Sequence, residues 1–360
     1  MSEAAATDKV GRPFFREDIA PYAQPHMGRS VLDLLTSVLP YLLLTVGMYL
    51  LLDVSYWWTL LLAIPAAGFL LRTYIVFHDC THGSFMKTKR ANAIVGTLTG
   101  LLVWTPFLNW RHSHAVHHAT AGDLDRRGEG DVPTYTVAEY FALPRKERVI
   151  YYIFRSPFGM FVLGPIVALI IQPRLIAEGT RPRLKRSVHL TNLALLVMVV
   201  GLALLIGPWD LFLVWFPVVM LAGASGVWLF YVQHQYEDAY WENHDTWNYA
   251  DSALRGSSYL KLPKILQFFT GNIGLHHVHH LSARVPNYNL QAAHDGIKLF
   301  EDVPVLTFWD GIKAVELKVY DEEGGKLVGW REARRIHAAA LARGEAAERS
   351  APPSLASDLA

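Results

Sequence analysis

The chain alternates long apolar runs with polar stretches, and four of the runs are long enough to cross a membrane. Residues 31–52 and 56–77 are two such runs separated by only three residues, so they predict a tight helical hairpin. Residues 188–206 and 211–232 repeat this arrangement across a four-residue turn. A helix needs about 20 predominantly apolar residues to cross roughly 30 Å of hydrocarbon. The pattern therefore predicts four transmembrane helices arranged as two hairpins.

Two further apolar segments are shorter or interrupted. Residues 93–108 contain Gly96, Gly100 and Pro106, and residues 149–171 are broken by a short polar and helix-breaking stretch at 155–157. Either segment can lie at the membrane interface or re-enter without crossing. If only one of them crossed, the second hairpin would lie on the wrong side for its charges, so we expect that neither crosses.

Beyond about residue 231 the chain is polar and contains no further long apolar run. We expect an N-terminal segment at 1–30, a membrane domain at 31–300 and a helical C-terminal region at 301–348, in which residues 331–348 are rich in Ala, Arg and Glu. Residues 349–360, with two prolines and small side chains, are expected to be disordered. The predicted fold class is an all-α integral membrane protein with a cap.

Composition agrees with a membrane protein. Hydrophobic residues make up 52% of the chain and charged residues only 18%, against about 25% charged residues in a soluble domain. The net charge of +1 gives no reason to expect a nucleic-acid partner. The single cysteine, Cys80, excludes an internal disulfide, a zinc ribbon and a cysteine-ligated iron–sulfur cluster. The first residues lack the apolar core of a signal peptide, so we expect the mature protein to begin there.

Lysine and arginine are distributed unevenly between the connections. The two tight turns contain neither residue, whereas the other connections contain Lys87, Lys89, Arg90, Arg145, Lys146, Arg148, Arg181, Arg183, Lys185 and Arg186. Positively charged loops stay on the cytoplasmic side of a membrane. Both termini and the long loops are therefore expected to be cytoplasmic.

Histidines gather at four places that this topology puts on one side of the membrane. HDCTH at 78–82 follows the second span, RHSHAVHH at 111–118 follows the first ambiguous segment, His234 ends the fourth span, and GLHHVHH occupies 274–280. Residues three and four apart share one side of a helix. Each box can therefore present its ligands on one face, and these are His78 and His82, then His114, His117 and His118, then His276, His279 and His280. His112 and His277 fall outside this register, and His277 is predicted to be spare.

Eight histidines, or nine with His234, exceed what one ion accepts, so two metals are predicted. Imidazole suits zinc, copper, iron and nickel alike. A zinc peptidase would require HExxH with its glutamate as general base, but the corresponding position here is Asp79. A metal centre at the membrane boundary, beside apolar spans that can shelter a long chain, points instead to oxidation of a lipid by a di-iron centre and O2.

The sequence then resembles a known family, the membrane fatty acid desaturases. HDCTHGSF, WRHSHAVHH and NIGLHHVHHLS look like the family's three histidine boxes, and GDLDRRGEGD, FYVQHQYED and ARVPNYNLQ match its connecting stretches. The resemblance runs from about Arg72 to about Leu290 and is greatest to the acyl-lipid branch with omega-6 (delta-12) desaturases and some delta-5 relatives. It implies four spans, a cytoplasmic cap, two iron ions and O2-dependent removal of two hydrogens from an acyl chain.

The family pattern assigns the catalytic metal ligands residue by residue. They fall on the eight histidines of the three boxes, and His234 matches an extra histidine that related desaturases place between the second and third boxes. The resemblance also implies an acyl lipid or acyl thioester substrate and a bacterial inner membrane location. Because the chain has no cysteine cluster and no fused haem motif, the electrons must come from a ferredoxin or a small haem carrier.

Several other residues carry separate expectations. Arg72 is expected to extend to the cytoplasmic headgroups, with a contact to the substrate headgroup or to acids near the metal ligands as the alternative. Six acids can accept the free N–H of a ligand imidazole: Asp79, Asp123, Asp125, Asp131, Glu237 and Asp238. Cys80 is expected to be a packed neutral thiol. Tyr56, Trp57, Trp58 and Trp209 are predicted to form an interfacial aromatic belt, and the single histidines His26, His189, His244, His294 and His337 to have surface or local hydrogen-bonding roles.

Two rival functions remain open from sequence. A hydroxylase on the same scaffold would add oxygen to the chain instead of removing the second hydrogen. A membrane metal transporter or sensor would place its ligands near the middle of the spans, whereas these histidines lie at the ends of spans or beyond them.

Overall fold

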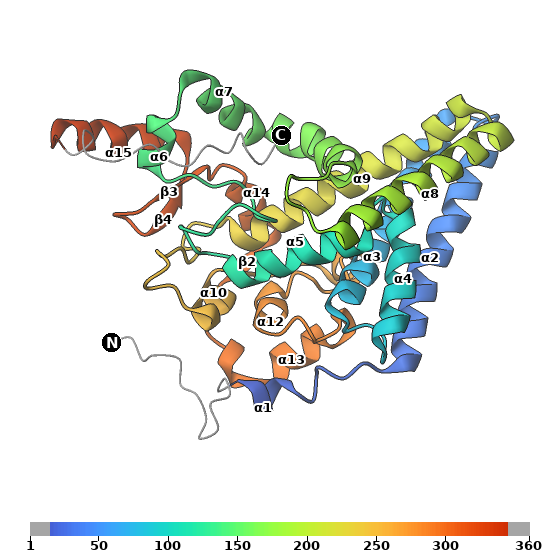
Figure 1. Ribbon diagram of the computed structural model, residues 1–360, viewed down its shortest axis with the longest axis horizontal. Coiled ribbons are helices and arrows are strands. Elements are labelled where there is room, and N and C mark those ends of the chain that lie inside the picture. Colours follow the sequence, from blue (N-terminus) through green and yellow to red (C-terminus); the bar gives the residue numbers. More distant parts are fainter. Residues whose placement is uncertain (1–14, 345–360) are drawn as a thin grey trace.

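The computed structural model describes residues 15–344, and helices dominate this part of the chain. Four helices are long and apolar enough to cross a membrane: α2 (Met27–Leu50), α3 (Tyr56–His82), α8 (Pro182–Ile206) and α9 (Pro208–His234). In Figure 1 these helices extend toward one side of the molecule, and the other elements gather at their opposite ends as a cap. The predicted architecture of two helical hairpins and a cap is confirmed.

The helices α3 and α9 are longer than a membrane requires. Each has 27 residues, which corresponds to roughly 40 Å at 1.5 Å per residue, against roughly 30 Å of hydrocarbon. Their last turns therefore extend past the apolar layer into the cap. The histidine box at 78–82 and His234 occupy these last turns.

The two ambiguous segments form bent helix pairs. The helices α4 (Lys89–Leu102) and α5 (Phe107–Thr120) meet at 100°, with Pro106 preceding the first residue of α5. The helix α7 (Arg145–Phe154) meets the irregular helical stretch η1 (Gly159–Leu163), η2 (Ile166–Ile171) and η3 (Gln172–Arg174) at 71°. Neither segment is one straight helix. The bend turns α5 across the cap-side ends of α3 and α8, which it contacts.

The cap combines short helices with two small sheets. Its helices are α1 (Arg16–Ile19), α6 (Val137–Ala142), α10 (Tyr249–Arg255), α11 (Lys264–Phe269), α12 (His276–Leu281), η4 (Asn287–Asn289), α13 (Leu290–Gly296), η5 (Lys298–Phe300), α14 (Phe308–Ala314) and α15 (Trp330–Ala342). Strands β1 (Tyr259–Lys261) and β2 (Val305–Thr307) are parallel, and β3 (Val319–Asp321) and β4 (Lys326–Val328) are antiparallel. The helix α15 lies within the region predicted to be helical, but positions from 345 onward, including the expected disordered tail, lie outside the described residues.

Two clusters of buried apolar side chains support the histidines. One lies among α2, α3, α4 and α9 and includes Met48, Phe77 and Val218. The other surrounds α12 and includes Val278 and Leu281, which are 0% and 3% exposed. Because these two side chains anchor α12 in the cap core, the helix is held in one rotational position and its histidines have fixed directions.

Candidate metal centre

Nine histidines from four helices converge where the spans meet the cap. The end of α3 contributes His78 and His82, α5 contributes His114, His117 and His118, the last residue of α9 is His234, and α12 contributes His276, His279 and His280. They form two groups, within each of which one ring nitrogen per residue lies within 4.8 Å of the others. The five-histidine group is His78, His82, His114, His118 and His279, and the four-histidine group is His117, His234, His276 and His280.

The helices α5 and α12 each contribute to both groups, in opposite proportions. On α5, His114 and His118 face the five-histidine group and His117 faces the other. On α12, His276 and His280 face the four-histidine group and His279 faces the other. Residues four apart nearly align on a helix, whereas a residue one position away is rotated by about 100°. The HxxHH spacing therefore divides its histidines between the two groups, a division that sequence alone did not establish.

Ring nitrogens within each group approach one another closely. Nε2 of His78 lies 3.0 Å from Nε2 of His114, and Nε2 of His234 lies 3.0 Å from Nε2 of His276. Nε2 of His117 and Nε2 of His280 are 3.2 Å apart. Two nitrogens bound at right angles to one ion at about 2.1 Å would be about 3.0 Å apart. These separations match ligands that share a metal ion.

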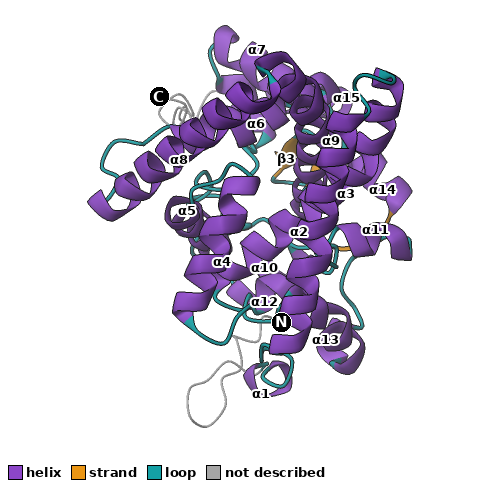
Figure 2. Cartoon of the chain, turned by 90° about the vertical axis from the view of Figure 1, so that its right-hand side faces the viewer, coloured by secondary structure: helices purple, strands orange, loops and turns teal. Residues whose placement is uncertain are grey.

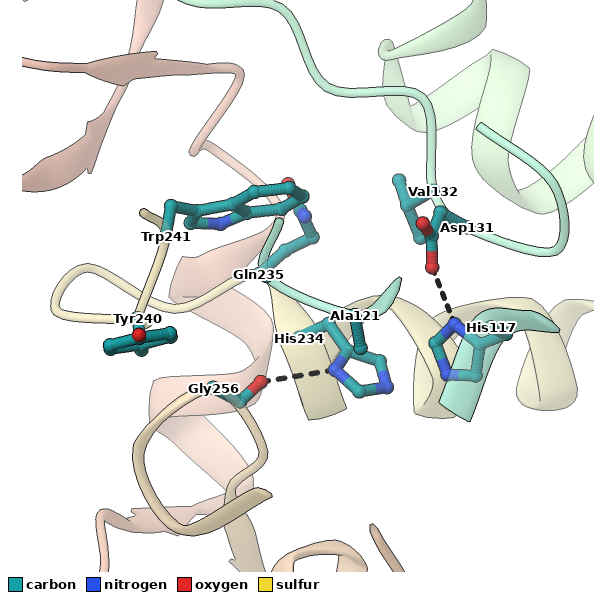
Figure 3. A pocket seen from close by; sticks show the side chains of 10 residues that line it. His117, Ala121, Asp131, Val132, His234, Gln235, Tyr240, Trp241 and Gly256 are labelled. Atoms are coloured by element: carbon teal, nitrogen blue, oxygen red, sulfur yellow. Dashed lines mark hydrogen bonds and ion pairs between the residues drawn. The ribbon is translucent and has the colours of Figure 1, made fainter. Parts of the chain in front are cut away.

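Three of the rings are oriented by a contact at Nδ1, the ring nitrogen that does not face the group. Nδ1 of His78 lies 3.2 Å from Asp79 Oδ1, Nδ1 of His117 lies 2.5 Å from Asp131 Oδ1, and Nδ1 of His234 lies 3.0 Å from the Gly256 carbonyl oxygen. Figure 3 shows the last two contacts. A proton held on Nδ1 by such an acceptor leaves the Nε2 lone pair directed into the group.

Several buried nitrogens have no protein partner. Nε2 of His82 and both ring nitrogens of His279 make no hydrogen bond within the described residues. Burial lowers the pKa of His276, His279 and His280, with neighbouring histidines adding to the effect. These rings are therefore neutral near pH 7 and can act as metal ligands. Buried unpaired nitrogens are costly, so the donor set fits two metal ions.

A small cavity reaches the four-histidine group from the cap side. It has a volume of about 10 Å³ and is lined by His117, His234, Asp131, Trp241 and other residues (Figure 3). This volume is close to the minimum that holds one water molecule. The cavity therefore has room for a water next to two of the histidines.

Only two of the six candidate acids contact these histidines. Asp79 and Asp131 do so, as described above. Asp123 accepts hydrogen bonds from Arg126 and His244, and Asp125 accepts one from the His244 backbone. Glu237 pairs with Lys326, and Asp238 is exposed. Closeness in sequence to a ligand identified Asp79, which adjoins His78, but not Glu237, which is three residues from His234 and pairs with Lys326.

The expectation that Arg72 extends to the headgroups is wrong. Its side chain is 12% exposed and pairs with Asp33 of α2, and it also donates to the Phe268 carbonyl. The amide of Asn287 then bridges Asp33 and Asp79, at 2.8 and 3.0 Å. A buried chain of contacts thus runs from Arg72 through Asp33, Asn287 and Asp79 to His78, so the alternative of a contact with acids near the ligands is closer to what is found. Asp33 was missed, although an acid within a predicted span was a signal for it.

The remaining sequence expectations concern residues outside the two groups. His112 is exposed, and His277 is buried, with its Nε2 3.0 Å from His294 Nδ1, away from both groups. Cys80 is fully buried in the apolar cluster, as expected. Trp57, Trp58 and Trp209 are exposed at the turn ends of the spans, where an aromatic belt was predicted. His26 caps α2, His189 is exposed, His244 contacts Asp123, and His337 stacks on Phe141.

Comparisons with known proteins agree with this geometry. A family model described as fatty acid desaturase matches residues 55–309. A protein of Bacillus subtilis (strain 168) named fatty acid desaturase is 44% identical over 320 residues, covering 89% of this chain and 91% of that protein.

More distant relatives have names that specify a reaction. An sn-1 oleoyl-lipid 12-desaturase of Picosynechococcus sp. (strain ATCC 27264 / PCC 7002 / PR-6) is 28% identical, over 77% of this chain and 82% of that protein. An sn-1 acyl-lipid omega-3 desaturase (ferredoxin) of Synechocystis sp. (strain ATCC 27184 / PCC 6803 / Kazusa) is 27% identical, over 62% of this chain and 63% of that protein. With a family match over most of its length and a well-covered relative at 44% identity, the chain belongs to the fatty acid desaturase family, a class of oxidoreductases.

Proposed function

We propose that this protein is an O2-dependent acyl desaturase that inserts a cis double bond into a lipid acyl chain at a di-iron centre. The observation that carries the proposal is the pair of adjoining histidine groups at the membrane boundary, in a chain that belongs to the desaturase family. The five-histidine group would hold one iron and the four-histidine group, with His234, the other. When bound, the irons would supply the oxidation by O2 that removes two hydrogens from neighbouring carbons.

The electron balance requires an external donor. Removing two hydrogens supplies two electrons, and reducing O2 to two waters takes four, so two electrons and two protons must enter from outside. We infer that a ferredoxin or a small haem carrier provides the electrons. A relative whose name includes ferredoxin supports the first of these.

The chain's own contribution is positioning and exclusion of water. The Trp110 ring stacks on His114 with centroids 4.3 Å apart, and the Phe230 ring lies 5.2 Å from His117. These aromatic walls flank one histidine of each group. An apolar surround of this kind would hold an acyl methylene beside the irons and keep water away from the oxidising centre.

We further propose an acyl lipid as the substrate, with an acyl thioester as the alternative, and delta-12/omega-6-like or delta-5-like regiochemistry. Relatives named as oleoyl-lipid desaturases support an acyl lipid rather than an acyl thioester as the substrate. We place both termini and the cap on the cytoplasmic side of a bacterial inner membrane, since the tight turns contain no lysine or arginine and the cap-side connections contain many. In this topology neither bent helix pair crosses the membrane.

Mass analysis of lipids from a host that expresses the protein tests the proposal. We expect acyl chains lighter by two hydrogens with the parent protein, and none above background with the variant His279→Ala. Chains heavier by one oxygen would identify a hydroxylase and contradict desaturation. Full unsaturation with His279→Ala would contradict the ligand role of this histidine. The position of the double bond in the product would then establish the regiochemistry.

A further inference from the structure

Two short helices of the cap expose large apolar side chains. On α11, Ile265 and Phe268 are 67% and 42% exposed, and on α14, Trp309 and Ile312 are 69% and 42% exposed. We call these four residues the α11/α14 patch. Exposed apolar side chains that gather on one surface usually mark an interaction site.

The two helices begin near each other because paired strands lead into them. The strands β1 and β2 are parallel with Lys261 opposite Thr307, and α11 and α14 begin within three residues of these positions. Figure 2 shows α11 and α14 as neighbours on the outer side of α3. The four side chains therefore belong to one region of the surface.

The helix α11 covers the end of the lipid-facing stripe of α3. Trp57, Leu61 and Ile64 are exposed along this stripe, and helical spacing continues it to Gly68 and Arg72. At Gly68 and Arg72, side chains of α11 cover the surface of α3. The Phe269 ring lies against Gly68, so close that an added Cβ would be 2.6 Å from it, and the Arg72 guanidinium lies 4.2 Å from the centre of the Phe268 ring.

The depth of this contact can be estimated from the length of α3. Gly68 is 12 positions beyond Tyr56, the first residue of the helix, which corresponds to roughly 18 Å at 1.5 Å per residue. The hydrocarbon layer is roughly 30 Å thick. With Tyr56 at the turn-side edge of this layer, α11 meets α3 at a level that is still within the membrane.

The helix α14 likewise covers the cap-side end of an exposed stripe, on α9. Leu221 and Ser225 are exposed on α9, and the next position of that stripe is Trp228. The Trp228 indole donates to the Gly311 carbonyl at 3.0 Å, and its ring lies 5.5 Å from the Phe308 ring. Trp228 is 19 positions beyond Trp209, or roughly 28 Å along the helix, which is close to the cap-side edge of the hydrocarbon.

The charges around the patch match a lipid surface. Lys261, Lys264 and Lys313 are exposed within or beside the two helices, together with two acids, Asp310, which lies 3.8 Å from Lys313, and the exposed Glu316. Apolar side chains with lysines at their border are typical of helices that lie in the interface, where the lysines reach the lipid phosphates.

We propose that the α11/α14 patch is immersed in the lipid leaflet on the cap side, so that the cap is anchored to the membrane by α11 and α14 as well as by the four spans. Ile265, Phe268, Trp309 and Ile312 contact acyl chains near the headgroup boundary, and the three lysines lie at the phosphates. The patch continues the exposed stripes of α3 and α9, and its placement in lipid does not depend on which oxidation the metal centre performs.

Spin labels test this placement in the full chain reconstituted singly into phosphatidylcholine–phosphatidylglycerol nanodiscs. Labels would be attached to cysteines introduced as Ile265→Cys and Trp309→Cys, with Glu323→Cys in the β3–β4 turn as the aqueous control and Leu43→Cys on the exposed face of α2 as the control for lipid. Cys80, the single native cysteine, is buried, and the parent chain measures its background. An unchanged size-exclusion profile would verify the fold of each variant.

The readout is the ratio of collision rates with O2, which partitions into lipid, and with a water-soluble nickel complex. We expect ratios at Ile265 and Trp309 several-fold above that at Glu323 and approaching that at Leu43. Ratios equal to that at Glu323 would show that the patch is in water. Protection from both reagents would show that a protein, or another part of the chain, covers the patch. Either of these results overturns the proposal.

Discussion

Individual histidines of the two groups differ in what fixes their rings. Asp79, Asp131 and the Gly256 carbonyl orient three of them, and Asp79 is itself held by Asn287 through both its backbone and its side-chain amide. The backbone N–H of Asn287 lies 2.7 Å from Asp79 Oδ2. Partners of this kind keep a ligand in its productive orientation and raise its affinity for the metal.

The substitution Asn287→Leu tests the role of this contact. The leucine removes the amide bridge between Asp33 and Asp79, so we expect metal affinity to fall by about 10-fold to 100-fold, the range typical for loss of such a partner. The measurement is metal retained after dialysis against a graded chelator series. Asn289→Leu is the matched control, because Asn289 contacts Arg29 and Tyr22 instead. Equal metal retention by the two variants would contradict the proposed role.

The variants His277→Gln and His279→Gln should differ in metal content. The His277 ring contacts His294 and lies outside both groups, so a glutamine there can keep a hydrogen bond and should leave the metal content unchanged. Glutamine at 279 removes a ligand from the five-histidine group, so one metal per chain should be lost. Metal analysis of both purified proteins decides the matter. A loss of metal in His277→Gln as large as in His279→Gln would invalidate the division of the third box.

Predictions about single residues succeeded where helical periodicity determines the side of a helix on which a side chain lies. Periodicity separated His112 and His277 from the other histidines, and both lie outside the two groups. Periodicity could not identify Asn287 or Asp33, because their contacts join distant parts of the chain. Asn287 contacts Asp79 across 208 positions of sequence, and Asp33 contacts Asn287 across 254 positions and Arg72 across 39. Such contacts depend on how α2, α3 and η4 pack together.

At the scale of elements, α5 and α12 determine how far apart the two groups lie. Each helix carries ligands for both groups, so a shift of either helix would change both groups together. The helix α5 ends at a sharp turn, in which Gly122 has a φ of +74° and its backbone pairs with Glu242. The return of the chain toward Asp131 therefore depends on a residue that adopts a left-handed conformation.

The substitution Gly122→Ala should destabilise the protein more than Gly179→Ala. Both glycines have positive φ, at +74° and +75°, and this conformation costs a residue with a Cβ roughly 1–2 kcal/mol. At Gly122 the added Cβ would also lie 2.8 Å from the Tyr240 carbonyl oxygen, whereas at Gly179 nothing lies within 4 Å. Thermal denaturation in detergent measures the difference. Equal losses would show that the turn accommodates a side chain.

Lys318, which precedes β3, should make stability depend on pH in the alkaline range. Its Nζ donates to the Arg155 carbonyl at 2.5 Å, and burial, together with the Arg155 charge, lowers the pKa of Lys318 to about 8. Between this pKa and the usual value of about 10.4, the unfolded chain binds a proton that the folded chain lacks. Folding stability therefore rises with pH in this window, by at most about 1.4 kcal/mol per pH unit.

The variant Lys318→Met removes this dependence. Relative to the variant, the parent protein should gain stability as pH rises from 8 to 10, measured by denaturation midpoints in one detergent. Lys326→Met is the control, because Lys326 is an exposed partner of Glu237, and it should show no such relative gain. A parent-to-variant difference that stays constant across the window would contradict the lowered pKa.

Element-scale predictions followed from length and composition. Four apolar runs of the required length gave α2, α3, α8 and α9, because a span must satisfy its backbone internally and expose apolar side chains. The bends of 100° and 71° were not predictable as angles. Glycine and proline indicated breaks at those places, but the angle is determined by packing, such as that of the Phe107 ring against Gly96.

At the scale of the whole molecule, the proposed metal ligands lie where the four candidate spans meet the cap. The overlong helices α3 and α9 bring three histidines from the spans, and α5 and α12 bring six from the cap side. In the proposed function, an acyl chain would approach this centre from the membrane and an electron donor from the cap side. The sequence predicted this convergence from topology, but the assignment of ligands to two groups required the three-dimensional packing of four helices.

The central claim is that these nine histidines hold two irons. Its most direct test is the iron-to-protein ratio of the purified parent chain, measured by elemental mass spectrometry alongside zinc, copper and nickel. We expect about two irons per chain, because imidazole-rich donors in two separate groups would each bind one ion. A single iron per chain, or a different metal at full occupancy in a preparation that desaturates lipid, would contradict it.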